Sequence, residues 1–361
     1  MASIEFNEIA HSYLRNPQEE SDYALKHIHH TWEDGGAYAL LGPSGCGKTT
    51  LLNIVSGLLT PSKGRVLYDG KDVTELPPEK RNIAQVFQFP VLYDTMTVFN
   101  NLAFPLRNRG ISEVEVKKRA LEVADILDLT PFLNKRASGL TADAKQKISL
   151  GRGLVRSDVA AILFDEPLTV IDPYLKWHLR RKLKEIHEQL KKTFIYVTHD
   201  QVEAMTFADQ VMVMNDGEIL QIGTPQNLFE NPEHTFVGYF IGSPGMNFIP
   251  CTLEGNVAKF NGAQIQIDDN VAARARTTQG KLELGIRPMY LEVHSQSTKG
   301  SVPARIKTVE DQGSCKIVTI IVDENILHAK VQEGQAIPEN EAWLRFPPQW
   351  TKLFADGRLI H

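Results

Sequence analysis

Residues 42–49 read GPSGCGKT and directly follow the short apolar run AYALL. The octet fits the phosphate-binding pattern G-x-x-x-x-G-K-[ST], and the apolar residues after Lys48 recur at helical spacing. Glycines let backbone N–H groups wrap phosphate oxygens, while the following helix presents its positive N-terminal end to them. The alternative, an ordinary glycine turn, leaves this strand and helix context unexplained. The predicted phosphate contacts are Gly42, Pro43, Ser44, Gly45, Cys46, Gly47, Lys48, Thr49 and Thr50.

Within this loop we expect Lys48 to reach the β- and γ-phosphates of ATP and the Thr49 hydroxyl to bind Mg²⁺. The run AAILFDE, residues 160–166, supplies two carboxylates at the end of a buried strand. Asp165 is placed to hold Mg²⁺, and Glu166 is placed to polarise the attacking water as a general base. Without the phosphate loop, this run would equally suit a strand end followed by acidic residues.

Two further polar residues follow apolar runs. His199 comes after the strand-like TFIYVT and can contact the γ-phosphate, although a single histidine there is more often structural. Gln88 lies in QVFQFP, where the alternative is a surface glutamine. The order of phosphate loop, Asp-Glu pair and strand-end histidine is what gives these positions their functional interpretation.

The composition is that of a folded protein with more than one domain. The chain has 361 residues, of which 42% are hydrophobic and 23% charged, with a net charge of −5. That charge gives no reason to expect nucleic acid, and three scattered cysteines fit a reducing cytoplasm. We read no secretory signal at the start and no run near the ~18 apolar residues that a membrane span needs. At a membrane, other chains would have to hold this one.

Strands alternating with helices up to about residue 235 predict an α/β domain with a mainly parallel sheet. The polar residues 16–22 are expected at a hairpin tip, and residues from about 90 to 156 form a helical subdomain. Beyond residue 236 short alternating runs such as KIVTIIV predict a small β-barrel or sandwich. The expected domains are therefore 1–235 and 236–361.

Taken together, these motifs resemble the nucleotide-binding domain of ABC transporters, and the resemblance covers essentially the whole chain. It implies that Tyr13 stacks on adenine and that Gln88 touches Mg²⁺ and the attacking water. It also implies that Asp172 is the D-loop aspartate that communicates across a dimer and that His199 is the switch histidine. The stretches FIGSPGMNFIP, LGIRP and FADGRLI resemble the OB-like regulatory domain of ATPases from carbohydrate-type importers.

The chain departs from the family at its signature, usually LSGGQ, where it reads LTADA, residues 140–144. In the family this loop closes over the γ-phosphate held by the opposite subunit, so Thr141, Ala142 and Asp143 would face that ATP. Thr141 keeps a hydroxyl, Ala142 loses glycine's freedom, and Asp143 adds a negative charge. Either Asp143 repels the phosphate, by ~3 kcal/mol at ~5 Å and a dielectric of ~20, or it turns away and caps the next helix. The altered signature beside a complete phosphate loop suggests a heterodimer with unequal sites.

The resemblance implies an energy-coupling ATPase with ATP and Mg²⁺, on the cytoplasmic face of the inner membrane. Its implied partners are transmembrane permease subunits, a second ABC ATPase and, indirectly, a periplasmic solute-binding protein. The stretches LTADAKQKISLGRGLVRSD and FDEPLTVIDPYLKW look most like one of the paired ATPases of glycerol importers. Another carbohydrate or glycerol phosphate is the alternative solute. Other classes are a soluble ABC ATPase acting on ribosomes or DNA and a P-loop kinase or GTPase.

The segment after Gln88 is a candidate docking surface for a helix of a membrane partner, through Phe89, Tyr93 and Phe99. The alternative is that these three aromatic side chains belong to the core.

Overall fold

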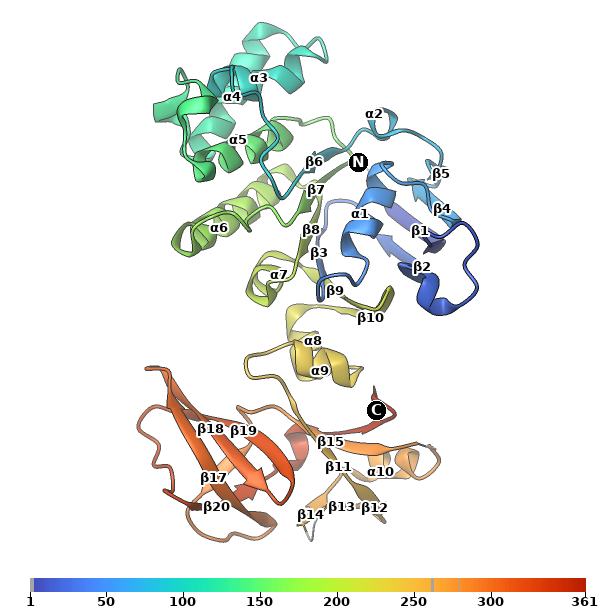
Figure 1. Cartoon of the computed structure of the whole chain (residues 1–361), viewed down its shortest axis with the longest axis vertical. Helices are drawn as coiled ribbons and strands as arrows, with labels where there is room; N and C mark the ends of the chain where they lie inside the picture. The colour runs from blue at the N-terminus through green and yellow to red at the C-terminus, as the bar shows by residue number, and fades with distance from the viewer. Residues whose placement is uncertain (1–2, 261–262, 279) are drawn as a thin grey trace. The chain divides into compact units, whose positions relative to one another are not determined.

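A computed structural model describes residues 3–260, 263–278 and 280–361. The chain divides into two compact units, Met1–Pro225 and Gln226–His361, which are described separately (Figure 1).

The first unit is built on a six-stranded sheet in the order β10-β9-β3-β8-β7-β6. All neighbouring pairs are parallel except β9 and β10, which form an antiparallel pair at one edge. The strands are β3 (Ala37–Leu41), β6 (Ala84–Val86), β7 (Ala161–Asp165), β8 (Thr193–Thr198), β9 (Gln210–Asn215) and β10 (Glu218–Gly223). Every residue of β3 and β8 is buried, as expected of central parallel strands covered on both faces. The predicted parallel α/β sheet is confirmed.

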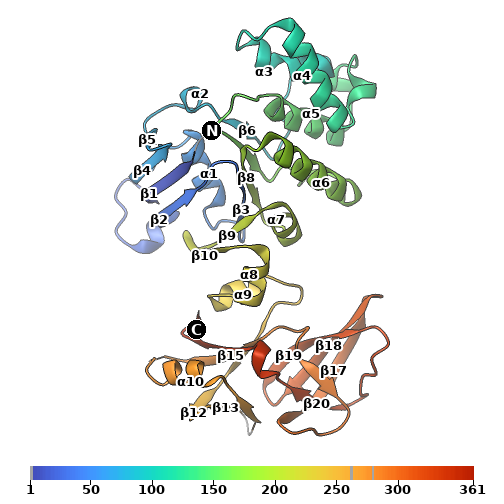
Figure 2. The same ribbon diagram turned by 180° about the vertical axis from the view of Figure 1, so that it is seen from behind.

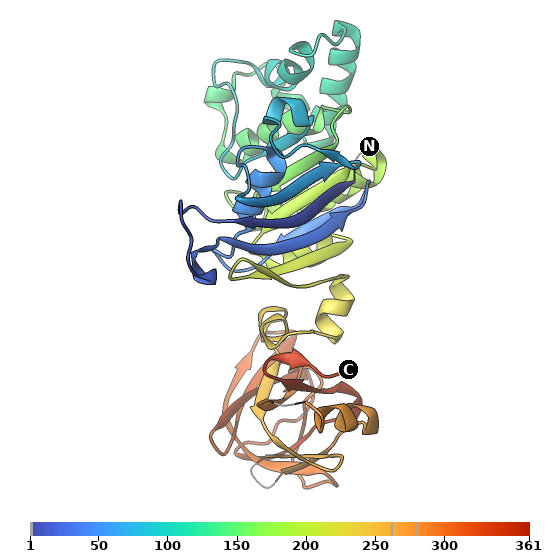
Figure 3. The ribbon, with the colours of Figure 1, turned by 90° about the vertical axis from the view of Figure 1, so that its right-hand side faces the viewer.

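A second, antiparallel sheet has the order β2-β1-β4-β5. Its strands are β1 (Ile4–His11), β2 (Leu25–Trp32), β4 (Lys63–Tyr68) and β5 (Lys71–Asp72). Residues 16–22 lie in the connection between the paired strands β1 and β2, which confirms the predicted hairpin. The two sheets share one apolar core, in which Phe6 and Trp32 meet edge to face at 4.7 Å. Figure 3 shows the two sheets side by side.

Three helices of the first unit form a group of their own. The helices α3, α4 and α5 contact one another and gather beyond the end of the sheets, in the region predicted to form a helical subdomain (Figure 2). Helix α3 begins within that region, after Thr97, whose side chain accepts a hydrogen bond from the Asn100 amide at 3.1 Å. The helices are α1 (Lys48–Ser56), α2 (Pro78–Arg81), α3 (Val98–Arg107), α4 (Glu113–Ile126), α5 (Ala142–Leu154), α6 (Pro173–Leu190) and α7 (Gln201–Phe207). Helix α8 (Pro225–Glu230) begins at the last residue of the unit.

The second unit is antiparallel β structure curled around its own apolar core, which confirms the predicted small β-barrel type (Figure 3). Its sheets have the orders β11-β15-β21-β22, β12-β13-β14 and β16-β20-β17-β18-β19. The strands are β11 (Asn247–Pro250), β12 (Thr252–Glu254), β13 (Val257–Phe260), β14 (Ala263–Gln266), β15 (Leu282–Ile286), β16 (Glu292–His294), β17 (Ser301–Asp311), β18 (Cys315–Val322), β19 (Asn325–Gln332), β20 (Glu341–Arg345), β21 (Thr351–Ala355) and β22 (Arg358–Leu359). Its remaining helices are α9 (Thr235–Phe240) and α10 (Asp269–Ala275).

A buried arginine organises the start of this unit. The Arg287 guanidinium donates to the carbonyl oxygens of Phe229 and Gly238 at 3.0 and 2.7 Å. It also donates to the Ile241 carbonyl. Burial lowers the pKa of Arg287 to about 10. The side chain thus satisfies carbonyls at the ends of α8 and α9 that lack partners within their helices.

Candidate nucleotide site

The phosphate loop joins β3 to α1, and its shape depends on glycine. Gly47 has φ +101° immediately before α1, and a Cβ there would lie 2.6 Å from the Ala24 carbonyl oxygen. A Cβ on Gly42 would lie 2.3 Å from the Met214 carbonyl oxygen. The buried Lys48 ammonium donates to the carbonyl oxygens of Gly42 and Pro43, both at 2.8 Å. The loop therefore holds a cation directly at the N-terminus of a helix, which is the arrangement that binds phosphate.

Two oxygen donors lie together beside this loop. The Thr49 hydroxyl donates to Asp165 Oδ1 at 3.4 Å, although the two residues are 116 positions apart. Burial and, secondarily, the neighbouring Glu166 carboxylate raise the pKa of Asp165. Mg²⁺ would suit this pair, because a cation offsets the cost of keeping a buried carboxylate ionised and a hydroxyl oxygen can bind it as well. Mg²⁺ takes few protein ligands and completes its shell with phosphate and water. The described residues hold no cluster of three or more His, Cys, Asp or Glu side chains fit for a metal.

Glu166 and His199 come from the ends of adjacent strands, β7 and β8, and their side chains meet. His199 Nδ1 lies 3.1 Å from Glu166 Oε1, and the Thr169 hydroxyl donates to Glu166 Oε2 at 3.3 Å. The Glu166 backbone has φ +46°, which aims the side chain away from the regular strand direction. The two residues that the sequence assigns to water activation and γ-phosphate contact are thus brought together.

Tyr13 contacts the helix that follows the phosphate loop, and Gln88 follows an edge strand of the parallel sheet. Tyr13 is 66% exposed, and its hydroxyl lies 3.1 Å from Thr50 Oγ1 on α1. Its ring also meets the His11 ring edge to face at 4.7 Å. An exposed ring tethered to the helix behind the phosphate loop is available for stacking on a base. Gln88 is half-buried and follows β6.

Of the two alternatives for Asp143 in the altered signature, the structure contradicts the helix cap, and the repulsion of a phosphate stays a prediction. Helix α5 is capped by Thr141, whose side chain accepts from the Ala144 amide at 3.3 Å, so the idea that Asp143 caps the helix is wrong. Ala142 is the first helical residue. Asp143 lies in the first turn, where Oδ2 is 3.8 Å from Lys147 Nζ and Oδ1 is buried with no hydrogen-bond partner. Its charge is partly neutralised by the next turn of its own helix.

Asp172 precedes α6 and its carboxylate accepts from the Tyr174 amide at 2.9 Å. Within this chain it is therefore a helix cap, and its role across a dimer stays a prediction. Of the predicted docking aromatics, Phe89 and Tyr93 are exposed and Phe99 is half-buried, so Phe89 and Tyr93 are available to a partner.

Two buried polar residues near the site were missed by the sequence reasoning. Gln146 in α5 contacts the loops that carry Gln88 and Glu166. Glu203 in α7 accepts from the Thr198 hydroxyl at 2.9 Å and lies 3.6 Å from Lys176 Nζ on α6. Neither has a sequence signal of its own, since Gln and Glu are ordinary surface residues on amphipathic helices.

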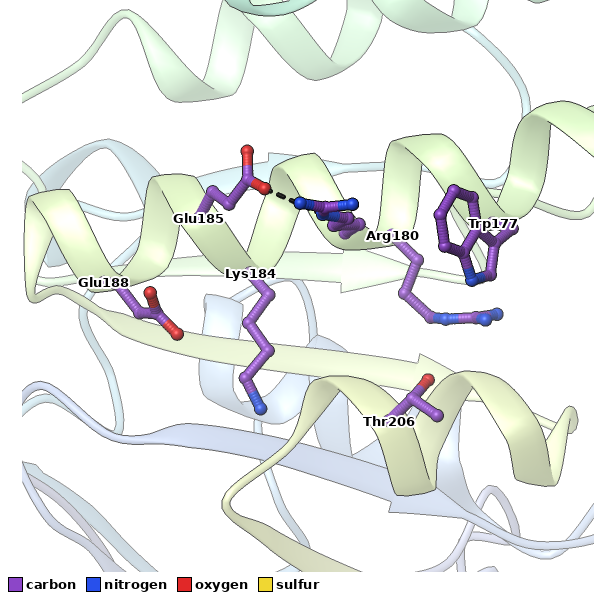
Figure 4. A pocket seen from close by; sticks show the side chains of 7 residues that line it. Trp177, Arg180, Lys184, Glu185, Glu188 and Thr206 are labelled. Atoms are coloured by element: carbon purple, nitrogen blue, oxygen red, sulfur yellow. Dashed lines mark hydrogen bonds and ion pairs between the residues drawn. The ribbon is translucent and has the colours of Figure 1, made fainter.

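A separate groove of about 350 Å³ lies along α6 and α7 and contains none of the predicted site residues (Figure 4). The side chains that line it carry both signs of charge, and Arg181 is paired with Glu185 at 3.0 Å. Trp177, Arg180 and Lys184 line the same groove.

Comparisons with known proteins agree with the geometry. Residues 25–169 match the ABC transporter family, and residues 242–288 match the MalK OB fold domain family. The chain is 41% identical over 315 residues to the sn-glycerol-3-phosphate import ATP-binding protein of Ruegeria pomeroyi, covering 87% of this chain and 85% of that protein. The protein of the same name from Salmonella typhi is 39% identical over 328 residues, with 90% of each chain covered.

Two solved structures are similar to a part of the chain. A cbiO1 protein from Clostridium perfringens is 27% identical with a TM-score of 0.57, covering 63% of this chain and 90% of that one. A dimeric ATP-binding cassette bound to ADP and phosphate is 28% identical with a TM-score of 0.55, covering 62% and 98%. In the described part of the chain, no helix has the length and apolar composition needed to cross a membrane.

Proposed function

Because this chain belongs to the ATP-binding subunits of ABC transporters of the carbohydrate-importer type, we propose that it powers the import of a small polyol or sugar, with glycerol as the first candidate. The chain is an ATPase. The observation that carries the site assignment is the convergence of Thr49, Asp165, Glu166 and His199 through contacts of 3.4 and 3.1 Å beside the phosphate loop.

The proposed reaction uses these side chains in turn. Backbone amides of residues 42–49 and Lys48 bind the phosphates, and Lys48 exchanges its carbonyl partners for phosphate oxygens. Mg²⁺, where Thr49 and Asp165 would hold it with Gln88, supplies charge neutralisation on the phosphate oxygens. Glu166 accepts a proton from the attacking water, while His199 holds the Glu166 carboxylate and reaches the γ-phosphate. Tyr13 stacks on adenine.

The solute is proposed from the likeness of this chain to other ATPases. The stretches around residues 140–158 and 164–177 look most like a glycerol-importer ATPase, which supports glycerol. The named relatives import sn-glycerol 3-phosphate, which makes the phosphate ester the second candidate. Uptake of labelled glycerol and of labelled glycerol 3-phosphate, measured with and without the gene, separates the two. Loss of only glycerol 3-phosphate uptake would overturn our first choice.

The partners follow from the family and from the altered signature. The chain works with transmembrane permease subunits, and we propose that Phe89 and Tyr93 form part of their docking surface. This chain combines a negatively charged signature turn with a complete phosphate loop. That combination supports a second, different ATPase as the dimer partner. A periplasmic solute-binding protein would act on the other side of the permease. The chain would lie on the cytoplasmic face of the inner membrane, with residues 236–361 as the regulatory domain.

Gentle solubilisation of native membranes, capture of a tagged chain and mass spectrometry test this proposal together. Recovery of multispan subunits and a second ATPase would support both importer and heterodimer. Recovery of the permease with this ATPase alone would contradict the proposed heterodimer. Recovery of ribosomes without membrane proteins would contradict the proposed transport function.

A further inference from the structure

We propose that Gln146 is a positioning residue that couples the signature helix to both halves of the hydrolytic site. The inference rests on the proposed roles of Gln88 and Glu166. Gln146 lies in α5, the helix that Thr141 caps and whose first turn carries Asp143, and its side chain is fully buried.

The geometry is a single amide group bridging two loops. Gln146 Nε2 donates to the Phe87 carbonyl oxygen at 3.2 Å and to the Pro167 carbonyl oxygen at 2.7 Å. Phe87 directly precedes Gln88, and Pro167 directly follows Glu166. The two hydrogens of one –NH₂ group therefore fix the backbone beside each residue proposed to handle the attacking water.

Helix α5 can transmit motion to this bridge because a helix moves as a rigid body over a few turns. Gln146 is five residues after Thr141, or about 7.5 Å along the axis, and one turn after Asp143. A rotation of α5 as its first turn closes over an ATP held by a partner would shift Nε2 relative to both carbonyls. The loops bearing Gln88 and Glu166 would then move together.

The other end of the side chain is not held by the protein. Gln146 Oε1 is buried and has no hydrogen-bond partner, so the amide is satisfied on only one side. A buried acceptor left without a partner is costly, and an all-apolar side chain of similar size would avoid that cost. Packing alone therefore does not explain a glutamine at position 146. The need of two loops for the same hydrogen-bond donor does explain it.

The test compares Gln146→Met with wild type in the full-length chain, purified with the partners that co-isolate with it. Methionine keeps the volume and removes the donor. We expect kcat for ATP hydrolysis to fall about tenfold while ATP affinity changes less than twofold, because the phosphate loop is untouched. Gln146→Lys restores a donor toward both carbonyls and should recover part of kcat.

Two controls separate positioning from loss of stability. Thr74→Val removes hydrogen bonds to the Val66 amide and Asp72 in the antiparallel sheet, and should lower the Tm without changing kcat. Gln88→Ala combined with Gln146→Met should lower kcat by less than the product of the separate effects. Equal loss of kcat in Thr74→Val, a matching loss of ATP affinity, or independent effects with Gln88→Ala would overturn the proposal. Glu166→Gln tests the site itself, since retained turnover there would contradict the proposed function instead.

Discussion

The charge on the signature turn should weaken nucleotide binding in the composite site, and Asp143→Asn tests this directly. A carboxylate ~5 Å from a γ-phosphate charge costs ~3 kcal/mol at an effective dielectric of ~20. Lys147 Nζ lies 3.8 Å from Asp143 Oδ2 and offsets part of that cost. At ~8 Å from the phosphate this ammonium contributes ~2 kcal/mol of attraction, which leaves a net repulsion of ~1 kcal/mol. Asparagine keeps the shape and removes the charge.

We therefore expect Asp143→Asn to tighten ATP binding by the assembled complex about fivefold, which is the factor that ~1 kcal/mol produces. Lys147→Met should do the opposite. Equilibrium binding of a fluorescent ATP analogue to the purified complex measures both variants, and raised salt should shrink the difference between them. Unchanged or weaker binding in Asp143→Asn would show that the carboxylate does not face a phosphate.

Three further variants test the site and the second unit. Glu166→Gln should lower kcat by about 10²- to 10³-fold with ATP binding retained, as measured by phosphate release. Asp165→Asn should raise the Tm measured without nucleotide at pH 7, because burial raises the pKa of Asp165 and its ionised form opposes folding; the gain should vanish at low pH, where the carboxyl is protonated in both states. The same variant should lose the extra stabilisation that Mg-ATP gives wild type. Arg287→Met should destabilise the second unit by about 3 kcal/mol, seen by urea denaturation, since the carbonyl oxygens of Phe229 and Gly238 lose the guanidinium donor and Gly238 keeps only the Met246 amide.

Local patterns made much of this structure predictable. The phosphate loop can be recognised within eight residues, because Gly42, Gly47 and Lys48 form a local pattern. The close approach of the Met214 and Ala24 carbonyl oxygens, which requires glycine at positions 42 and 47, is visible only in the folded chain. The strand ends bearing Asp165 and His199 were equally accessible, since an apolar run followed by a polar residue marks the carboxyl edge of a parallel sheet.

Contacts between distant segments were not predictable in the same way. Gln146 gains its meaning only when α5 packs beside the loops at residues 87 and 167, which are 59 and 21 positions away. The mistaken cap at Asp143 had a readable signal, since Thr141 is also a favoured cap residue and stands at the correct offset from the Ala144 amide. The sequence predicted a helix after the signature, but it did not choose between two neighbouring capping side chains.

Glu166 sits in left-handed backbone, with φ +46°, where a side chain with a Cβ costs of order 1–2 kcal/mol. Glycine would occupy this position without that cost, yet it would bring neither a carboxylate nor a contact for His199. At position 166 the residue that gives the highest stability therefore differs from the residue that catalysis requires. Engineering that screens this protein only for heat resistance would favour glycine or asparagine at position 166. The resulting subunit would be more stable but would no longer hydrolyse ATP.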